Sequence, residues 1–260
     1  MHRVRLIVEY DGTNYVGWQI QPNGISVQEV LKRELSSLTH EDIIVHGSGR
    51  TDSGVHALAQ VVHFDTDSKI PADKIPYALN IRLPNDIRVK YGDEPTNQQF
   101  HARFDVKRKH YRYTILNARH NSAFTSNTAL HVYKYLDINK MQEAAQCILG
   151  EHDFIAFKAE GTTLKSTVRT MYESSWSKQG DFLYYDICGS GFMYNMVRIL
   201  VGTMLEIGKG YIPVDSLQKA LASKDRSNSG ATAPAHGLAM TRVEYDDFDT
   251  KTALDKIILN

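Results

Sequence analysis

The chain has 260 residues, enough for two modest domains or one large one. Hydrophobic residues make up 42% and charged residues 23%, the balance of an ordinary globular protein, and no run approaches the ~20 apolar residues of a membrane helix. Thirty Lys and Arg balance thirty Asp and Glu, so the protein is not strongly basic. Its net charge alone therefore does not indicate a nucleic-acid partner.

The first ten residues enter a strand pattern directly, without the apolar core of a signal peptide. Residues 4–10 alternate, with Val4, Leu6 and Val8 on one side, and the pattern ends at Asp11-Gly12, a turn. The two cysteines, Cys147 and Cys188, both lie in apolar contexts and are expected to be packed thiols. These features predict a cytoplasmic protein.

The first half continues with a helix and further strands. Ser26-Val27-Gln28-Glu29 is a capping box, followed by apolar residues at helical spacing. The further elements expected are a strand at 43–45, a strand at 57–65, a helix at 71–80 and a strand at 87–91. The resulting order, βαββαβ, is that of a ferredoxin-like unit.

The second half repeats this order without repeating the sequence. The elements expected are a strand at 110–115, a helix capped by Asp137 and ended by Gly150, strands near 168–177 and 181–188, an apolar helix at 192–207 and a strand at 239–245. Together the halves predict an α+β fold of two ferredoxin-like units, 1–104 and 105–260. We expect this fold to be pseudo-symmetric, with a central cleft between the units that holds the functional site.

The nine residues from Gly49 to Ala57, Gly-Arg-Thr-Asp-Ser-Gly-Val-His-Ala, place one carboxylate, Asp52, in a loop of small residues directly before a strand. A short acid in this position is poorly suited to packing and well suited to nucleophilic attack. Gly49 and Gly54 allow steep backbone geometry or the close approach of a large ligand. An isolated Thr-Asp-Ser-Gly would more simply be a turn whose Asp caps its own backbone.

The apolar helix expected at 192–207 carries Tyr194, Asn195 and Arg198 on one stripe, and Gly202 leaves room beside Arg198. A buried arginine without a partner is costly, so an anion should face it. One interpretation is an ion pair with an acid such as Glu206 or Asp186. The other is that Arg198 faces Asp52 across the cleft and keeps that carboxylate ionised and oriented.

Tyr111 and Tyr113 lie on one face of a predicted strand, beside a cluster of positive charge. Aromatic faces next to cations are how proteins stack and hold exposed bases, although Tyr113 is interpreted as a core residue. Two groups of basic residues would meet RNA if RNA binds, and either could instead be a solvated face. The first group is Arg103, Lys107, Arg108, Lys109, His110 and Arg112, and the second is Lys158, Lys165 and Arg169.

Four stretches of the sequence, in this order along the chain, resemble signatures of the bacterial-type tRNA pseudouridine synthase A family. They are the Asp52 loop, Lys109-His110-Tyr111-Arg112-Tyr113, the stretch from Gly189 to Arg198, and Ala231-Thr232-Ala233-Pro234-Ala235-His236-Gly237-Leu238. Ser190 and Met193 are mild departures from the third signature. The resemblance covers nearly the whole chain.

The resemblance implies conversion of uridine to pseudouridine at positions 38, 39 and 40 of the tRNA anticodon stem-loop, by a homodimer that contacts tRNA with both subunits. It implies Asp52 as the nucleophile and Tyr111 as the residue that stacks on the target uracil. A uridine in a stem must leave the stack to reach Asp52, and Arg50, beside the acid, is a good candidate to hold the flipped state. Attack at C1′ of the ribose and attack at C6 of the uracil both remain open.

No metal spacing, dinucleotide fingerprint, phosphate loop or nucleophile elbow occurs, so no metal and no cofactor are expected. An isomerisation needs neither. Two other functions remain open. Paired ferredoxin-like units also describe a protein that only binds RNA, although the aromatic motif of such modules is absent. A nucleoside or glycoside hydrolase would use Asp52 as nucleophile, although the motif loops offer no second carboxylate as general acid.

Overall fold

The structure, a computed structural model, describes residues 1–159 and 165–257. It forms two compact units, Met1–Lys109 together with Met240–Asn260, and His110–Ala239. The predicted units, 1–104 and 105–260, divide the chain at nearly the same first point, but residues from Met240 onward belong to the first unit rather than the second. They do so because Ala253, on helix α6 (Thr250–Asp255), packs with Ile7 and Ala59 of the first unit.

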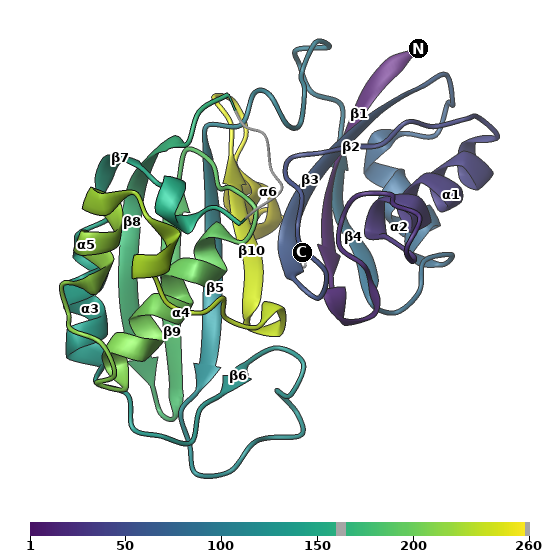
Figure 1. The fold of residues 1–260 in the computed structure, drawn as a ribbon. Helices are drawn as coiled ribbons and strands as arrows, with labels where there is room; N and C mark the ends of the chain where they lie inside the picture. Colours follow the sequence, from purple (N-terminus) through teal and green to yellow (C-terminus); the bar gives the residue numbers. More distant parts are fainter. Residues whose placement is uncertain (160–164, 258–260) are drawn as a thin grey trace. The chain divides into compact units, whose positions relative to one another are not determined.

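The first unit has the βαββαβ order that the sequence predicts. Its elements are β1 (His2–Tyr10), α1 (Val27–Thr39), β2 (His46–Gly47), β3 (His56–Thr66), α2 (Ile75–Asn80) and β4 (Ile87–Asp93). The pairs β1–β4, β1–β3 and β2–β3 are antiparallel, which gives the strand order β4-β1-β3-β2 (Figure 1). β10 (Leu238–Glu244) also pairs with β3, on the side away from β1, and its residues from Met240 onward belong to this unit. The mixed α+β class is confirmed.

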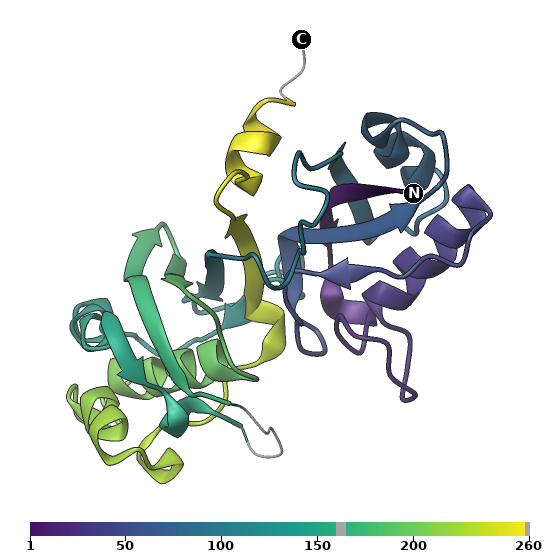
Figure 2. The ribbon, with the colours of Figure 1, turned by 90° about the horizontal axis from the view of Figure 1, so that it is seen from above.

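Both faces of β1 are buried, because helices cover the sheet of this unit on both sides. A Cβ added to Gly92 would lie 3.1 Å from Leu6 Cδ2 and 2.3 Å from the carbonyl oxygen of Ala72, so Leu6 faces the segment that leads into α2. Ile7 points the other way, to Ala253 on α6, the last helix, which follows β10 (Figure 2). Leu6 and Ile7 are both fully buried, as burial of each face requires.

The strand predicted at 43–45 is wrong by a few residues. Ile43 and Val45 are buried and Ile44 is 65% exposed, so their alternation is real, but the backbone pairing of β2 begins only at His46. His46 pairs with His63, and Gly47 pairs with Val62. Apolar alternation reports which side chains are buried, and it does not report which peptide groups find a partner strand.

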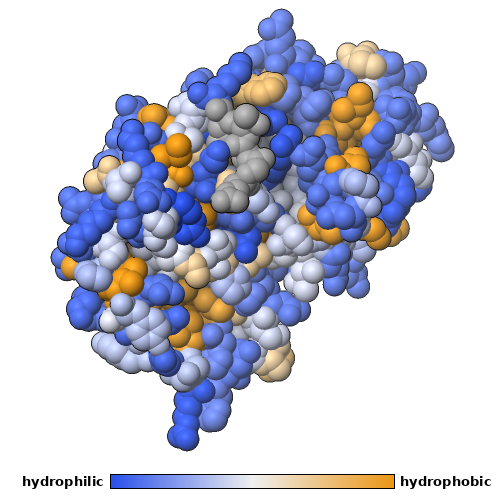
Figure 3. Space-filling view, in the orientation of Figure 1, coloured by the Kyte–Doolittle hydropathy of each residue, from blue (hydrophilic) through white to orange (hydrophobic). Residues whose placement is uncertain are grey.

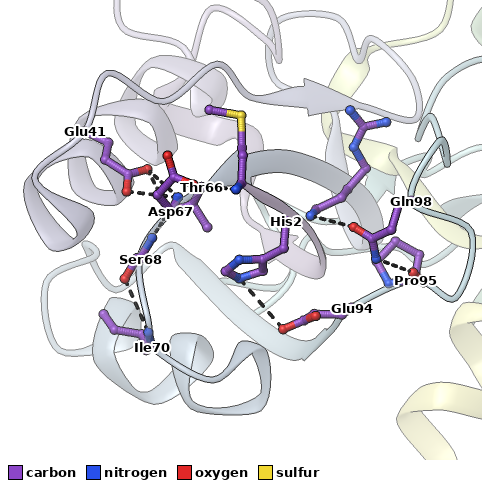
Figure 4. A network of polar contacts seen from close by, with 11 residues as sticks. His2, Glu41, Thr66, Asp67, Ser68, Ile70, Glu94, Pro95 and Gln98 are labelled. Carbon is purple, nitrogen blue, oxygen red and sulfur yellow. Dashed lines mark hydrogen bonds and ion pairs between the residues drawn. The ribbon is translucent and has the colours of Figure 1, made fainter.

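The start of β1 is held by polar contacts from three other segments of the unit (Figure 4). The Arg3 amide donates to Gln98 Oε1 at 3.0 Å, and His2 lies 3.7 Å from Glu94. On the other side, Glu41 accepts from the Thr66 hydroxyl at 2.7 Å and from the Asp67 amide at 3.1 Å. The first two contacts hold β1 to the segment after β4, and those of Glu41 hold the end of β3, the strand that pairs with β1.

The second unit carries the repeated order with additions. Its elements are β5 (Arg108–Leu116), β6 (Leu130–His131), α3 (Ile138–Gln146), β7 (Gly150–Asp153), β8 (Val168–Gln179), β9 (Phe182–Gly189), α4 (Met196–Gly208) and α5 (Ser216–Ser223). The strand order is β5-β9-β8-β7, and α3, α4 and α5 lie on one side of these strands (Figure 1). Trp176 on β8 donates to Met204 Sδ on α4 at 3.2 Å, which joins the helix layer to the sheet.

Two helix boundaries in this unit differ from the predictions. α3 is capped by Asp137, as predicted, but it ends at Gln146, and Gly150 (φ +88°) begins the unpredicted strand β7, which pairs with β8. α4 begins at Met196 rather than 192, because Asn195 has a left-handed backbone (φ 60°) that a helix interior does not tolerate. The sequence therefore predicts that both helices exist and places them approximately, but it does not predict their exact first and last residues.

The cysteines are packed thiols, as predicted. Cys188 is buried and Cys147 is half-buried, and burial raises the pKa of the Cys147 thiol to about 11. Within residues 1–159 and 165–257, none of the helices is both long and apolar enough to cross a membrane. On the face drawn in Figure 3, hydrophobic residues form small scattered groups among hydrophilic ones, which is ordinary for a protein surface.

Candidate functional site

Asp52 lies half-buried in the loop between β2 and β3, on a backbone that is fixed at both sides. Before it, the buried Thr51 hydroxyl lies 2.8 Å from the Tyr10 hydroxyl, and the Thr51 carbonyl accepts from the Trp18 amide at 3.1 Å. After it, the Val55 amide donates to the Asp52 carbonyl at 3.1 Å and closes a turn. The carboxylate is therefore presented at the surface by a buried frame.

Gln60, a fully buried residue of β3, holds the first part of the same loop. Its Oε1 accepts from the Ser48 hydroxyl at 2.5 Å and from the Gly49 amide at 3.2 Å, while its Nε2 donates to the Gly49 carbonyl at 2.7 Å. Gly49 is thus bound by both of its peptide groups. The sequence analysis missed this residue, although a glutamine among Leu58, Ala59, Val61 and Val62 on a buried strand was a usable signal.

Two glycines allow the segment after β1 to pack directly on the Asp52 loop. A Cβ at Gly17, whose φ is +105°, would lie 2.5 Å from the Thr51 carbonyl oxygen, and a Cβ at Gly12 would lie 2.1 Å from the Val55 carbonyl oxygen. Neither distance is possible for a real side chain. Glycine is required at both positions because the backbones touch, and Gly17 also needs its positive φ.

Cations surround the start of this loop. Arg50 is exposed and lines a pocket of about 170 Å³ together with Arg103. The Lys109 ammonium lies beside Gly49, since a Cβ added there would be 3.1 Å from Lys109 Nζ. Lys107, by contrast, pairs with Asp246 at 2.9 Å. The structure therefore places Arg50, Arg103 and Lys109 at the Asp52 loop, whereas Lys107 forms an ion pair with Asp246.

Tyr111 lies on β5 in the second unit, and only 7% of it is exposed. Its ring meets the ring of Phe192 edge-on, with centroids 5.1 Å apart. Tyr113, two residues on, is fully buried and donates its hydroxyl proton to the Pro234 carbonyl at 2.8 Å, so its interpretation as a core residue is confirmed. The two tyrosines share a face of the strand but have different surroundings.

Arg198 is half-buried on the first turn of α4, and the orientation of its guanidinium is set by neighbours in the same unit. Its Nη1 donates to Asn195 Oδ1 at 2.7 Å, and its Nε donates to the Ala233 carbonyl at 2.8 Å. The ion pair with Asp186 that the sequence left open is wrong, because Asp186 accepts both bonds of a fork from Arg112, at 2.8 and 2.9 Å. Tyr194 and Asn195 precede the helix rather than lie on it.

The loop from Ala231 to Leu238 completes the surroundings of Arg198. A Cβ at Gly202 would lie 1.7 Å from the Ala231 carbonyl oxygen, so the room that Gly202 leaves is filled by loop backbone. The Ala233 amide in turn donates to the Arg198 carbonyl at 3.0 Å. The helix and the loop thus bind each other on both sides of the arginine.

The remaining predicted RNA contacts in this unit have mixed surroundings. Arg112 is used by Asp186, and Lys158 is half-buried. Lys165 is exposed. Arg169 donates to the Ser166 and Val168 carbonyls at 3.0 and 2.6 Å, and its Nε lies 3.6 Å from a Cβ added to Gly191, near the Tyr111–Phe192 pair.

The candidate residues therefore form two groups, one in each unit. Asp52, Arg50, Arg103 and Lys109 belong to the first, and Arg108 lies in the same unit at the start of β5. Tyr111, Arg198 and Arg169 belong to the second. The contacts described above lie within one unit or the other, and the pairing of Arg198 with Asp52 stays a prediction.

Comparison with known proteins gives one consistent result. A family model described as tRNA pseudouridine synthase matches residues 6–105 and 144–246. Relatives named tRNA pseudouridine synthase A from Thermoanaerobacter sp. (strain X514), Ruminiclostridium cellulolyticum and Bacillus subtilis (strain 168) are 46%, 47% and 45% identical over 245, 246 and 247 residues, covering 94% of this chain and 100% of each relative. A chain of a solved Cbf5-Nop10-Gar1 complex is 12% identical with a TM-score of 0.38, over 93% of this chain and 50% of that chain, which is too distant to add to this result.

Proposed function

Because the chain belongs to the tRNA pseudouridine synthase family and is therefore an isomerase, we propose that it converts uridine to pseudouridine in tRNA, at positions 38, 39 and 40 of the anticodon stem-loop. The observation that carries the assignment of residues is the Asp52 loop. A half-exposed carboxylate is held there by a loop whose Thr51 side chain bonds Tyr10, whose Thr51 carbonyl bonds Trp18 and whose Gly49 bonds Gln60. Such a frame preorganises a nucleophile, so little conformational entropy is lost when the substrate binds.

The proposed reaction begins with the target base leaving the stack, since an enzyme cannot reach the atoms of a base inside a stem. Arg50, exposed and two residues before the acid, takes the place that the base leaves or holds the flipped state. Asp52 then attacks as a carboxylate, at C1′ or at C6. The N1–C1′ bond breaks, the retained base rotates and C5 bonds to C1′. The bond that Asp52 formed at C1′ or C6 breaks again and frees the carboxylate. C5 loses its proton and N1 gains one.

The second group of residues has two proposed roles. Tyr111 stacks on the flipped uracil and is placed to help remove the C5 proton, and its edge-on contact with Phe192 supports a fixed ring. Arg198 faces Asp52 and keeps it ionised. Two hydrogen bonds support this role. Arg198 Nε and Nη1 donate to Ala233 and Asn195, and these bonds orient the charged guanidinium.

Two further parts of the proposal concern assembly and place. We propose that the chain acts as a homodimer with tRNA contacting both subunits, and that it works in the cytoplasm. Analytical ultracentrifugation, alone and with tRNA, tests the first part. A species of one chain bound to one tRNA, fully active in turnover, would contradict it.

The assignment of Asp52 is tested with a tRNA transcript that carries tritium at C5 of uridine. Wild type should release tritium, and Asp52→Asn, which keeps the size of the side chain and removes its charge, should release none while binding tRNA with a similar Kd. Asp73→Asn, an exposed acid next to Lys74, is the control and should behave as wild type. Tritium release by Asp52→Asn at the wild-type rate would contradict the role of the carboxylate.

The same reaction separates the other functions. Free uracil with an abasic tRNA would identify a hydrolase, because the base would have left rather than rotated. Tight binding by wild type without tritium release or free uracil would identify a protein that only binds RNA. Mapping the pseudouridines in the product settles which of positions 38, 39 and 40 are modified.

A further inference from the structure

A pocket in the first unit adjoins the Asp52 loop, and among the pocket residues named below Arg50 is the one to which the proposed reaction gives a role. It is lined among others by Trp18, His46, Gly49, Arg50, His101 and Arg103. Its volume of about 170 Å³ equals the share of about six waters at ~30 Å³ each, enough for one flat ring or a phosphate. Because Gly49 and Arg50 belong to the Asp52 loop, an occupant would lie beside the catalytic carboxylate.

The rim of this pocket carries two guanidinium groups that no acid neutralises. Across the described ranges 1–159 and 165–257, no carboxylate pairs with Arg50 or Arg103, and no acidic residue lines the pocket. Arg3 and Arg5 of the same unit differ from these two, since Arg3 binds Asp65 and Arg5 binds Asp93, both through two bonds. Two unneutralised guanidiniums at one opening are suited to an anion with several oxygens, such as a phosphodiester.

His101, which lines the pocket, belongs to a group of aromatic rings that extends beyond the lining to Phe104. His101 stacks on Phe104, with centroids 4.2 Å apart and planes at 29°, and Phe104 is 74% exposed. His46 lies 5.2 Å from His101. Most of the Phe104 ring therefore faces solvent, and exposed rings beside arginine are the arrangement on which proteins stack single bases.

The histidine ring serves in this group as a neutral surface rather than as a charge. His101 Nδ1 accepts from the amides of Arg103 and Phe104, at 3.1 and 3.3 Å, which requires that nitrogen to be unprotonated. Burial is the largest of the effects that lower the pKa of His101. The positive charge of the site therefore comes from the arginines, and the rings supply the stacking face.

The segment that carries His101, Arg103 and Phe104 is held rigidly by buried contacts. The Ala102 amide donates to His63 Nδ1 at 3.1 Å, and the Ala102 carbonyl accepts from the Tyr245 hydroxyl at 2.7 Å. Arg3 Nη1 adds a bond to the Phe100 carbonyl at 2.6 Å. A surface segment anchored on both peptide groups of its central residue is preorganised for binding.

We propose that this pocket binds one nucleotide of the substrate RNA next to the target uridine, with its base stacked on the His101–Phe104 face and its phosphate between Arg50 and Arg103. The inference rests on the proposed function, in which the substrate is RNA and Asp52 is the nucleophile. It extends that function by a second specific contact that holds the strand on one side of the flipped base. Such a contact stabilises the flipped state, because the neighbour of the target gains a protein ring to stack on when it loses its stacking partner.

The test uses tRNA binding in the Asp52→Asn background, so that no turnover occurs during the measurement. Phe104→Leu should raise Kd about 5- to 100-fold, the effect of losing one stacked base. Arg103→Gln should lower the slope of log Kd against log salt by ~0.7 to 0.9, the effect of losing one phosphate contact. The matched controls are Phe124→Leu, an exposed ring of the other unit (99%), and Arg82→Gln, whose guanidinium donates to Ser37, and neither should change binding.

The location of the bound nucleotide is tested with RNAs that lack a single base on either side of the target. At one position, removal of the base and Phe104→Leu should not add, because each removes the same stacked pair. Additive effects at every position would overturn the proposal, and so would unchanged Kd in Phe104→Leu or an unchanged salt slope in Arg103→Gln. A loss of affinity equal in Phe104→Leu and Phe124→Leu would also overturn it.

Failure of this proposal and failure of the proposed function give different results. Tritium release by the wild-type protein, with no coupling between Phe104 and any RNA base, overturns the pocket and leaves the reaction in place. Coupling without tritium release overturns the reaction and leaves the pocket as an RNA site. Circular dichroism of each variant confirms that these results come from folded protein.

Discussion

Gln60, eleven residues after Gly49, binds the amide and the carbonyl of Gly49 and the hydroxyl of Ser48. An amide side chain can do this because it carries a donor and an acceptor at the spacing of a peptide group. Asn80 uses the same device on Val89 in another part of the unit, with both bonds at 2.8 Å. One residue therefore serves the site and the other serves only the fold.

The two amides give a matched prediction. Gln60→Ala and Asn80→Ala should both lower the free energy of unfolding by about 2–4 kcal/mol, because each leaves buried peptide groups without partners. Only Gln60→Ala should also slow single-turnover tritium release, by at least 10-fold, since the loop that carries Asp52 loses its anchor. Urea unfolding and single-turnover kinetics measure the two effects. Equal rate losses in both variants would show that Gln60 acts through stability alone.

At the scale of elements, the sequence predicts what a local pattern encodes. The capping box at Ser26 places the start of α1 correctly, because both of its bonds are made within four residues. The Asp52 loop was likewise found from one contiguous motif. The contacts of Tyr10, Gly17 and Gln60 with that loop depend on the packing of separate segments, and no local pattern specifies which distant residue will be the neighbour.

The start of α4 shows the same limit and carries a prediction. Asn195 has a left-handed backbone, and its Oδ1 accepts a hydrogen bond from Arg198. The residue therefore contributes both a backbone conformation and a side-chain hydrogen bond. Asn195→Gly should keep the backbone and lose the contact, whereas Asn195→Ala should lose both. We expect slower single-turnover tritium release in both variants and an additional loss of about 1 kcal/mol of stability only in Asn195→Ala.

Kinetics and urea unfolding of the pair separate the two contributions. Wild-type rates in Asn195→Gly would show that the hydrogen bond to Arg198 does not position the guanidinium for the reaction. Gly210→Ala, at another position of positive φ (+74°) with open space around it, is the control for backbone strain without a site contact.

At the scale of the whole molecule, buried histidines link stability to pH. His63 is 2% exposed, and burial, followed by the charges of Arg3, His101 and His46, lowers its pKa from 6.5 to about 3, against an opposing effect of Asp65. Below pH 6.5 the unfolded chain therefore binds a proton that the native chain does not. The stabilisation is fully present above pH 6.5 and is lost as the pH falls from 6.5 toward 3.

Urea unfolding at pH 7.0 and pH 5.5 measures this effect. Wild type should lose about 1 kcal/mol more than His63→Asn over this interval, because asparagine keeps an acceptor for the Ala102 amide and cannot take up a proton. The exposed His40, changed to asparagine, should leave the wild-type pH dependence intact. Equal losses in wild type and His63→Asn would show that His63 is protonated in the native protein.

The interrupted first unit has a consequence for synthesis on the ribosome. Ile7 and Ala59 acquire their partner Ala253 only after the 130 residues of His110–Ala239 have been translated. At the usual elongation rates this leaves a patch of the nascent sheet uncovered for roughly 7 to 26 seconds. The unit that carries Asp52 is therefore completed only after the second unit has been translated, and we expect a chaperone that shields Ile7 and Ala59 during that interval to raise the yield of active protein.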